Sequence, residues 1–550
     1  MQASIGRLDV SSGFARRSVP NPGEQMFLRV PPFPGSKVQS LAFSTTSGRP
    51  TEALISRLRE LRVGGRFWAA QPDLPGRYLL CRSAEALESA RLLVGDCPLL
   101  LWDDKGSGLP ADCDPWHMLS NASELVIDEP DEVCAVAAAL EVPVRIFDQK
   151  TGELKDFDRQ ARELLWRAIG PTTWRNPFTE LEMTASEAIE LCGFWRALID
   201  SNRDLAGGIG FAFWKQAQVA PLLWGGSGRS FHFMNRLPSR LDARLALWRS
   251  RAPAELVAAA EAQQIALVEV EDGFLRSQGL GADCVPPLSI TVDRLGAYFD
   301  PSGPTELELL LQNGHIDEAL LERARRLRRV IVEAGLGKYE AAGTQTQLER
   351  PGGERRHVLV AGQVEDDRAV ELGGCGLVSN LELLSRVRAD VGDAYIIYKP
   401  HPDVAAGHRR GAIPEAQCLQ YADRVIANEP ISSLIEMADA VHVNTSLAGF
   451  EALMREKPVT THGVPFYAGW GLTRDLGAVP KRRNAPRTLD EMVAAVLLMY
   501  PRYLDPVSGL PCPAEIIAER LTNGMGSAGL LVTMRRLQGR IMRTVRNLVS

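Results

Sequence analysis

The chain has 550 residues, a length that predicts about two to four domains. Its apolar fraction of 45% and charged fraction of 24% are ordinary for a globular protein, and a formal net charge of −6 argues against a nucleic-acid-binding surface. The 9 cysteines show no CxxC spacing, so we expect reduced thiols and no metal site. We find neither a secretory signal nor the roughly 18 consecutive apolar residues of a membrane-spanning helix, and therefore expect a cytoplasmic location.

The first part of the chain falls into two predicted regions. Residues 1–50 are rich in Ser, Gly and Pro and predict a poorly ordered leader. Residues 51–217 alternate helical and short apolar patterns, which predicts a divergent α/β module with a helical linker. Within this module, residues 122–144 resemble residues 438–459. This similarity indicates that the module is a degenerate copy of a later one. The alternative is that two α/β segments match by chance.

The remaining chain alternates short apolar strands with helices, a pattern typical of parallel sheets. Residues 218–354 and 355–505 predict two Rossmann-like domains, and residues 506–550 predict C-terminal helices. Such sheets bind ligands at the carboxyl ends of their strands. The candidate strands are 265–271, 357–362, 394–399, 424–428, 440–444 and 458–463, while residues 286–300 predict a loop and a short hairpin.

Acidic side chains follow two of these strands. Glu271 and Asp272 end the first strand, where a carboxylate could deprotonate a hydroxyl group; a capping acid before a turn glycine is the alternative. A second acidic cluster follows the strand 357–362. One of its carboxylates could attack an anomeric carbon, although the cluster could also bind a metal or be a solvated loop. The cluster, which comes directly after Gln363 and Val364, consists of Glu365, Asp366 and Asp367.

Two further motifs predict a site for phosphate. In the sequence YKPHPDV, prolines stiffen the backbone around His401, and Lys399 precedes it at the end of a strand. An imidazole and an ammonium group suit a phosphate leaving group, while the alternative is a structural loop histidine. Thr445 and Ser446 precede a predicted helix, and the N–H groups at a helix N-terminus can bind an anion. The alternative is that Thr445 or Ser446 simply caps the helix, and the two roles can coexist.

Together these motifs closely resemble the capsule polysaccharide biosynthesis family of KpsC type. Its members transfer β-linked Kdo (3-deoxy-D-manno-octulosonic acid) from CMP-Kdo. The resemblance covers about 265–505, is strongest to the second catalytic module of full-length members, and rests on EDGFLRSQGLGADCVPPLSITVDRLGAYFD, LGKYE, GQVEDD, SNLELL, YKPHPDV, TSLAGFEALMREKPV and GVPFYAGWGLTRD. It implies an α/β fold with a GT-B-like pair of Rossmann-type domains, preceded by a divergent α/β region and followed by C-terminal helices. Residues 218–354 would face the acceptor and residues 355–505 would bind the nucleotide sugar.

The resemblance also implies a retaining glycosyltransferase that needs neither metal nor cofactor. Asp367 would be the nucleophile, Glu271 or Asp272 the acid/base for the acceptor, and His401 a ligand of the CMP phosphate. The implied partners are a nucleotide sugar, a lipid-linked glycan acceptor and capsule assembly or export proteins. The expected supporting residues around the nucleotide are Lys399, Thr445, Ser446, Glu451 and Gln363.

Three points qualify this interpretation. Residues 1–180 contain no EDG, GQVEDD or KPHP motif, so we expect one active site. The motifs do not identify the donor sugar, so one alternative is a transferase of another CMP-activated acidic sugar. The other alternative is a non-catalytic partner of the capsule export machinery. Residues 531–550 carry 5 arginines that flank an apolar helical face, which predicts a tail lying on the inner membrane face or, alternatively, a helix packed on its own domain.

Overall fold

The computed structural model describes ten stretches of the chain. They are residues 27–38, 40–45, 50–91, 97–103, 105–106, 108–170, 172–238, 241–275, 286–337 and 348–524. Most of the predicted leader and the whole basic tail, together with parts of the EDGFLRSQGLGAD and LGKYE motifs, therefore lie outside the described residues.

The described residues form two compact units. Unit 1 comprises those within 1–32, 38–200 and 226–228, and unit 2 comprises those within 33–37, 201–225 and from 229 onward. Residues 201–217, which the sequence places in the N-terminal module, thus belong to unit 2. Some of the predicted leader is structured as well, because Phe27 and Leu28 are buried and residues 42–45 form a strand.

Unit 1 is built on a five-stranded sheet with the order β3-β2-β4-β5-β6, in which only β6 is antiparallel to its neighbour. These strands are β2 (Tyr78–Cys81), β3 (Leu99–Leu101), β4 (Ala122–Ile127), β5 (Val144–Asp148) and β6 (Glu153–Asp156). A separate antiparallel sheet contains β1 (Ala42–Thr45), β7 (Thr172–Arg175) and β8 (Glu182–Met183). The helices are α1 (Glu52–Leu61), α2 (Ala84–Arg91), α3 (Pro115–Leu119), α4 (Glu132–Leu140), α5 (Asp158–Ile169) and α6 (Ala185–Asp200).

The first sheet of unit 2 has seven strands in the order β10-β9-β11-β12-β13-β20-β21. The first four are parallel, and each later strand is antiparallel to its neighbour. The strands are β9 (Leu205–Ile209), β10 (His232–Met234), β11 (Arg244–Leu247), β12 (Leu267–Asp272), β13 (Ser289–Asp293), β20 (Pro501–Leu504) and β21 (Pro511–Cys512). Helices α7 (Phe213–Leu223), η1 (Arg249–Arg251), α8 (Ala254–Ala262), α9 (Glu306–Asn313) and α10 (Glu318–Glu333) accompany them.

Strand β13 differs from the sequence expectation of a loop and a short hairpin. All five of its residues are buried, and it continues the sheet as the antiparallel partner of β12. The buried run is short and includes polar residues at Ser289, Thr291 and Asp293, so its hydrophobic pattern alone is weak. The sheet supplies partners for this polar strand: Asp293, for example, accepts a hydrogen bond from the Tyr500 hydroxyl at 2.8 Å.

The second sheet of unit 2 is entirely parallel, with the order β16-β15-β14-β17-β18-β19. It is formed by β14 (His357–Ala361), β15 (Tyr395–Lys399), β16 (Arg424–Val425), β17 (Ala440–Val443), β18 (Val459–Thr461) and β19 (Arg474–Asp475). Its helices are α11 (Arg368–Gly373), α12 (Asn380–Val391), α13 (Pro402–Ala405), α14 (Glu415–Cys418), α15 (Ile431–Met437) and α16 (Leu447–Met454). Near-continuous apolar strands are typical of a parallel sheet covered on both faces, and the predicted strands here are confirmed.

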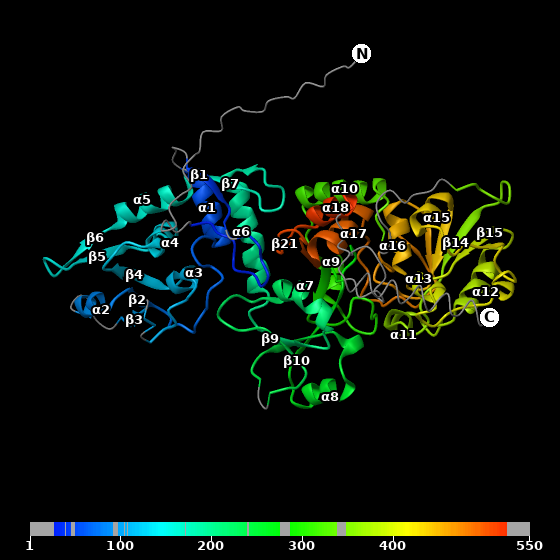
Figure 1. Cartoon of the computed structure of the whole chain (residues 1–550), viewed down its shortest axis with the longest axis horizontal. Coiled ribbons are helices and arrows are strands. Elements are labelled where there is room, and N and C mark those ends of the chain that lie inside the picture. The colour runs from blue at the N-terminus through cyan, green and yellow to red at the C-terminus, as the bar shows by residue number, and fades with distance from the viewer. Residues whose placement is uncertain are drawn as a thin grey trace, which may run out of the picture. The chain divides into compact units, whose positions relative to one another are not determined.

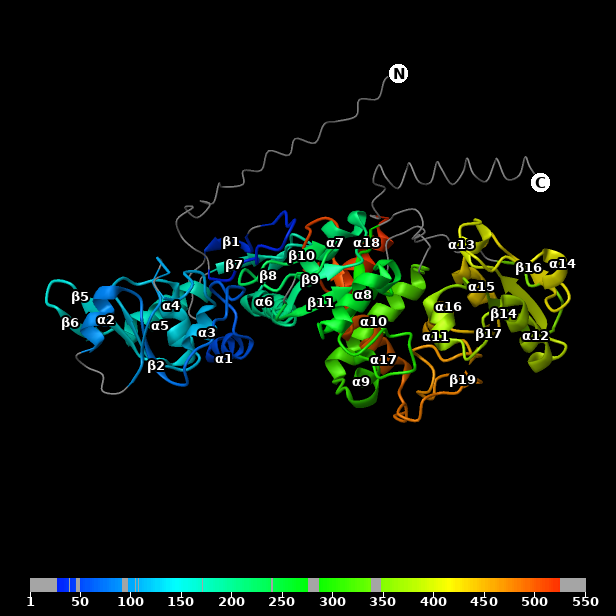
Figure 2. The ribbon, with the colours of Figure 1, turned by 90° about the horizontal axis from the view of Figure 1, so that it is seen from below.

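The chain crosses back to the first sheet before it leaves the described region. Helix α17 (Leu489–Val493), the π-helix η3 (Ala494–Met499) and α18 (Ala514–Thr522) pack against α10, while β20 joins the first sheet. Figures 1 and 2 show α17 and α18 beside α10. Arg325 of α10 pairs with Asp490 at 2.9 Å, and Arg323 pairs with Glu515 at 2.8 Å. The return lies before the predicted domain boundary at 505. The resulting pair of Rossmann-type domains is the expected GT-B-like fold.

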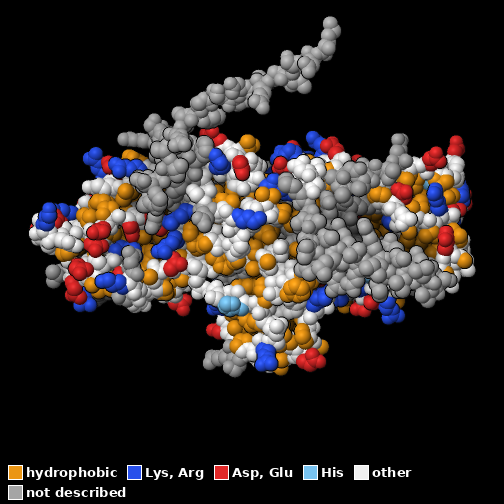
Figure 3. Space-filling view, viewed as in Figure 1, with side chains coloured by type: hydrophobic (Ala, Val, Ile, Leu, Met, Phe, Trp, Pro, Cys, Tyr) orange, Lys and Arg blue, Asp and Glu red, His pale blue; other side chains and the backbone are white. Residues whose placement is uncertain are grey.

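Charged side chains of both signs are interspersed over the described residues on the face in Figure 3. No large area of a single sign dominates that face, in keeping with the slightly negative formal charge of the chain. Among the residues that the structure describes, no helix has the length and apolar character needed to cross a bilayer.

Candidate functional site

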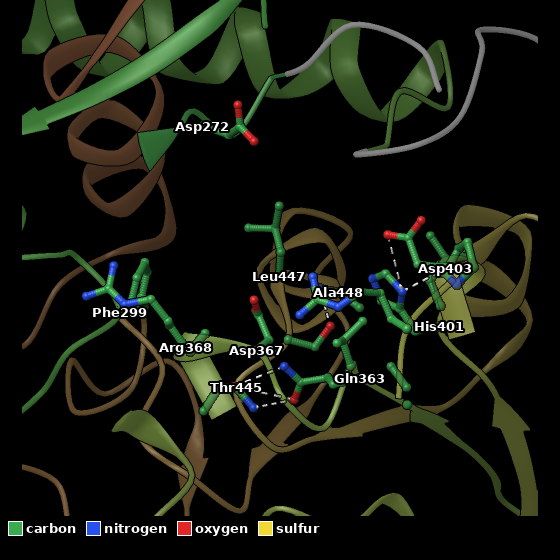
Figure 4. A pocket seen from close by; sticks show the side chains of 18 of the residues that line it. Asp272, Phe299, Gln363, Asp367, Arg368, His401, Asp403, Thr445, Leu447 and Ala448 are labelled. Atoms are coloured by element: carbon green, nitrogen blue, oxygen red, sulfur yellow. Dashed lines mark hydrogen bonds and ion pairs between the residues drawn. The ribbon is translucent and has the colours of Figure 1, made fainter. Parts of the chain in front are cut away.

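A cavity of about 1560 Å³ lies in unit 2. Its walls come from the segments that follow the carboxyl ends of β9, β11 and β12 in one sheet and of β14, β15 and β17 in the other. Figure 4 shows Asp272 on one side of this pocket and Asp367, Gln363, Thr445 and His401 on the other. The carboxyl ends of parallel strands in two sheets therefore bring the predicted motifs to one space, as this class of fold requires.

Gln363 fastens two strand ends of the second sheet together. Its backbone N–H donates to Asn380 Oδ1 at 2.8 Å, and its side-chain amide donates to Thr445 Oγ1 at 3.0 Å. Its side-chain oxygen in turn accepts from the Thr445 backbone N–H at 2.8 Å. The side chain is buried, so these bonds act in a low dielectric and fix the loop that carries the acidic cluster.

The segment after β17 offers a helix N-terminus to the cavity. Ser446 is the N-cap of α16, and its hydroxyl oxygen accepts from the Ala448 N–H at 3.2 Å. Thr445, Ser446, Leu447 and Ala448 all line the cavity. Helix N-termini stabilise anions through oriented N–H groups and the helix dipole, so this edge suits a phosphate.

His401 is oriented by its own backbone. It caps α13, and its Nδ1 accepts a hydrogen bond from the Asp403 N–H at 3.1 Å. An accepting Nδ1 places the proton of the neutral imidazole on Nε2, which can then donate to a ligand oxygen. Lys399 also lines the cavity, but its buried ammonium donates to the Ala427 carbonyl at 2.6 Å, a bond that joins β15 to the segment after β16.

The three acids of the cluster have different surroundings. Glu365 accepts from the Asn380 backbone N–H at 2.8 Å, and Asp366 pairs with Arg409 at 3.2 Å. Asp367 is exposed at the start of α11 without capping that helix through its side chain, and it faces the cavity. Within the described part of the chain, two carboxylates are thus held by protein partners and the third is open to a ligand.

Glu271 and Asp272 sit opposite this cluster with different partners. Glu271 receives a hydrogen bond from Arg368 at 3.0 Å, and Asp272 receives one from Lys215 at 3.0 Å. Burial, reinforced by the neighbouring Asp272 carboxylate, raises the pKa of Glu271 to about 8 although Arg368 and Lys215 oppose the shift. Glu271 is therefore a carboxyl group that exchanges a proton near neutral pH.

Glu451 also reaches this space. It lies on α16, is buried, and lines the cavity below the helix N-terminus. The structure thus brings all nine predicted site residues to one cavity, since Glu271, Asp272, Gln363, Asp367, Lys399, His401, Thr445, Ser446 and Glu451 line it.

The sequence interpretation missed the wall formed by Trp214, Lys215, Trp248 and Arg251. These residues follow β9 and β11, which were not recognised as strands. The glycines of β9 hide its pattern, yet they are needed because a Cβ on Gly207 would lie 2.4 Å from the His232 carbonyl oxygen of the adjacent strand. The signal in the sequence that could have indicated this wall is the aromatic residues that directly follow short apolar runs.

Unit 1 repeats the topology of the second sheet. Its order β3-β2-β4-β5 and strand directions match β15-β14-β17-β18, and the two similar sequence segments form β4-α4-β5 and β17-α16-β18. At the corresponding edge, Asp131 caps α4 and pairs with Arg82 at 3.1 Å, and Arg82 lies 4.2 Å from the ring of Trp102. An acid and its own arginine thus occupy the edge that binds anions in such sheets, which favours the interpretation of unit 1 as a degenerate copy.

Part of this chain is similar to proteins of capsule polysaccharide biosynthesis. A family model described as capsule polysaccharide biosynthesis protein matches residues 244–503. The capsule polysaccharide modification protein LipA of Neisseria meningitidis is 39% identical over 318 residues, which are 57% of this chain and 45% of LipA. The lipopolysaccharide-processing protein LpsZ of Rhizobium meliloti is 44% identical over 255 residues, which are 46% of this chain and 57% of LpsZ. The chain thus spans about half the length of these curated relatives.

This chain is also similar to a solved structure. Thermosulfurimonas dismutans KpsC, a β-Kdo 2,4 transferase, is 32% identical, and the match covers 58% of this chain and 98% of that structure with a TM-score of 0.50. The residues that line the cavity on the second sheet and at the end of β12 all lie within 244–503.

Proposed function

Since the chain belongs to the capsule polysaccharide biosynthesis protein family, we propose that it is a retaining glycosyltransferase that moves Kdo from CMP-Kdo to a lipid-linked glycan. The observation that carries this proposal is the cavity, in which an open carboxylate on one sheet faces a carboxyl group with a raised pKa on the other. This arrangement separates a nucleophile from an acid/base, as a double displacement requires.

In the first displacement, the Asp367 carboxylate attacks the anomeric carbon of the sugar. The bond between that carbon and the phosphate oxygen breaks, and CMP leaves with the bonding electron pair. His401 Nε2–H and the N-terminus of α16 stabilise the developing negative charge on the phosphate. The product is a sugar esterified to Asp367, with its anomeric configuration inverted once.

In the second displacement, an acceptor hydroxyl attacks the same carbon and releases Asp367. Glu271 takes the hydroxyl proton, and the second inversion gives net retention. We assign this role to Glu271 rather than Asp272 because Lys215 holds Asp272 as an ion pair at 3.0 Å, whereas the pKa of Glu271 is raised to about 8. The Glu271 partner, Arg368, follows the nucleophile directly in sequence and bridges the two walls at 3.0 Å.

Replacing His401 with alanine should slow CMP release and weaken CMP binding. Loss of one preorganised donor to a developing charge costs about 10²–10³-fold in rate. Single-turnover CMP release and CMP titration by calorimetry would measure both effects. The matched control is His408→Ala, because His408 lies just beyond the other end of α13 and does not line the cavity. Unchanged CMP release and CMP affinity in His401→Ala would remove His401 from the phosphate site.

Transfer should persist without a divalent metal. The phosphate charge is met by His401 and the N-terminus of α16, and Asp366 is already paired with Arg409. Among the residues that the structure describes, no cluster of three or more metal-ligating side chains occurs. Equal transfer rates in EDTA and in added Mg²⁺ are expected. A strict metal requirement after exhaustive chelation would instead make Asp366 and Asp367 ligands.

The donor itself is tested by comparing CMP-Kdo with CMP-activated sialic acid. Faster CMP release from CMP-Kdo supports the proposal, whereas preference for another acidic sugar supports the first alternative. Absence of turnover with any donor would favour a non-catalytic partner of the capsule assembly or export machinery.

We further propose that the basic tail holds the protein at the inner membrane face, which sedimentation of the full chain with anionic liposomes would test.

A further inference from the structure

Three neighbouring parallel strands of the first sheet end at the cavity wall opposite the nucleotide edge. Strand β9 leads into α7 with Trp214 and Lys215, β11 leads into Trp248 and Arg251, and β12 ends at the proposed acid/base. The four residues Trp214, Lys215, Trp248 and Arg251, here called the aromatic wall, have no role in the displacement steps. They line the same cavity as Glu271 and follow strands of the sheet that carries it.

Lys215 holds one side of the aromatic wall in place. Its ammonium nitrogen lies 3.5 Å from the ring centroid of Trp248, 5.2 Å from that of Trp214, and 3.0 Å from Asp272 Oδ1. A buried cation in the first turn of a helix is unfavourable to the helix dipole, so its position is not explained by the stability of α7. The contacts instead fix the two indole rings relative to the carboxylates of β12.

Arg251 is the available cation of this wall. The cavity is lined by three arginines, of which Arg368 pairs with Glu271 and Arg409 pairs with Asp366. Arg251 is exposed, and its guanidinium makes no hydrogen bond or ion pair with any residue that the structure describes. The backbone beneath it is closely packed, because Gly210 has φ +81° and a Cβ there would lie 2.3 Å from the Trp248 carbonyl oxygen.

We propose that the aromatic wall is a subsite for a carboxylate-bearing sugar of the acceptor glycan. The half-buried Trp214 ring offers an apolar face to the C–H face of a sugar, while the buried Trp248 ring lies against the Lys215 ammonium and supports it. A guanidinium binds a carboxylate through two parallel hydrogen bonds. The subsite belongs to the acceptor because the nucleotide edge lies on the other sheet. The identification of its ligand as the acceptor rests on the proposed function.

Direct binding tests this subsite without any turnover. The probes are a soluble alkyl β-Kdo glycoside and its C1 carboxamide, titrated by NMR into the full chain with CMP present. Arg251→Gln should weaken binding of the carboxylate probe by about 10–100-fold and leave the carboxamide unchanged, because only the charged hydrogen bonds are lost. Trp214→Ala should weaken both probes. The control is Arg236→Gln, which removes the same charge from an exposed residue that does not line the cavity.

Kinetics provide the second readout. Arg251→Gln should raise KM for the glycolipid acceptor by a similar factor and leave the KM for CMP-Kdo and its slow hydrolysis unchanged. Equal binding of the carboxylate probe by Arg251→Gln and wild type, equal weakening of both probes, or no binding of the carboxylate probe to wild type would each overturn the subsite. Binding that depends on Arg251 in a protein that transfers no Kdo would retain the subsite and refute the proposed function.

Discussion

Replacing Asp367 with asparagine is expected to lower Kdo transfer by about 10⁴-fold or more, because a neutral amide cannot form the glycosyl ester. The substitution keeps the size of the side chain, and Asp367 does not cap α11 through its carboxylate, so the fold should be retained. Transfer from CMP-Kdo to a glycolipid, followed by mass spectrometry, measures the loss. Circular dichroism and CMP affinity would verify that the variant is folded and binds nucleotide.

The neighbouring acid provides the matched control for that variant. Asp366→Asn removes the same charge one residue earlier, where the carboxylate also lines the cavity but is held by a solvent-exposed ion pair with Arg409. Exposed ion pairs contribute about 0–1 kcal/mol, so this variant should remain within a few-fold of wild type. Near-normal transfer by Asp367→Asn together with a severe loss in Asp366→Asn would move the nucleophile to Asp366.

Replacing Glu271 with glutamine is expected to lower transfer about 10²–10⁴-fold and to abolish its dependence on pH near neutrality. A general base acts in its ionised form, and the pKa of Glu271 is raised to about 8 by burial and the Asp272 carboxylate. The wild-type rate of transfer from the glycosyl-enzyme should therefore rise with pH up to about 8 and then level off. The first release of CMP should be much less affected, because that step does not use Glu271.

Arg368 offers an independent check of this assignment. Its guanidinium lowers the pKa of Glu271, so Arg368→Gln should move the rising limb of the pH profile to higher pH. A purely structural role for Arg368 would reduce the rate without moving the limb. A wild-type profile that is flat from pH 6 to 9, or a limb that survives in Glu271→Gln, would exclude Glu271 as the base.

The sequence was most informative where the burial pattern is simple. The strands of the second sheet are buried on both faces and read as apolar runs, so β14, β15 and β17 could be predicted almost to the residue. Strands β9 and β13 could not be predicted in this way. Glycines shape the first for close packing, and polar side chains with tertiary partners interrupt the second. The return of β20 to the first sheet is likewise a long-range pairing without a local signal.

The predicted site shows the same division between local and long-range information. Motifs placed at strand ends identified Glu271, Asp272 and Asp367 on the cavity wall, because residue type and topology are enough to place them, whereas Glu429, which also lines the cavity, was missed. The residue types alone did not distinguish Asp367 from Asp366, a choice that came from the family resemblance, and the choice between Glu271 and Asp272 stayed open. Those distinctions depend on Arg409 and Lys215, which come from segments about 40 to 60 residues away in sequence.

In unit 1, the strand order of the sheet shows a similarity to unit 2 that a search for sequence motifs does not find. The similarity of residues 122–144 to 438–459 is weak, but both segments form parallel β-α-β units in sheets of matching order. At the edge of the unit 1 sheet that corresponds to the nucleotide edge, Arg82 pairs with Asp131, and the unit carries no nucleotide motif. The account therefore requires a single CMP site, in unit 2.

The central claim is tested most directly by incubating the purified chain with CMP-Kdo and a synthetic glycolipid acceptor, and by determining the product by mass spectrometry and NMR. The account predicts a glycolipid extended by one Kdo residue that retains the β configuration of the donor, with one CMP released for each residue transferred. An unchanged glycolipid beside intact CMP-Kdo, or a product with inverted configuration, would contradict it.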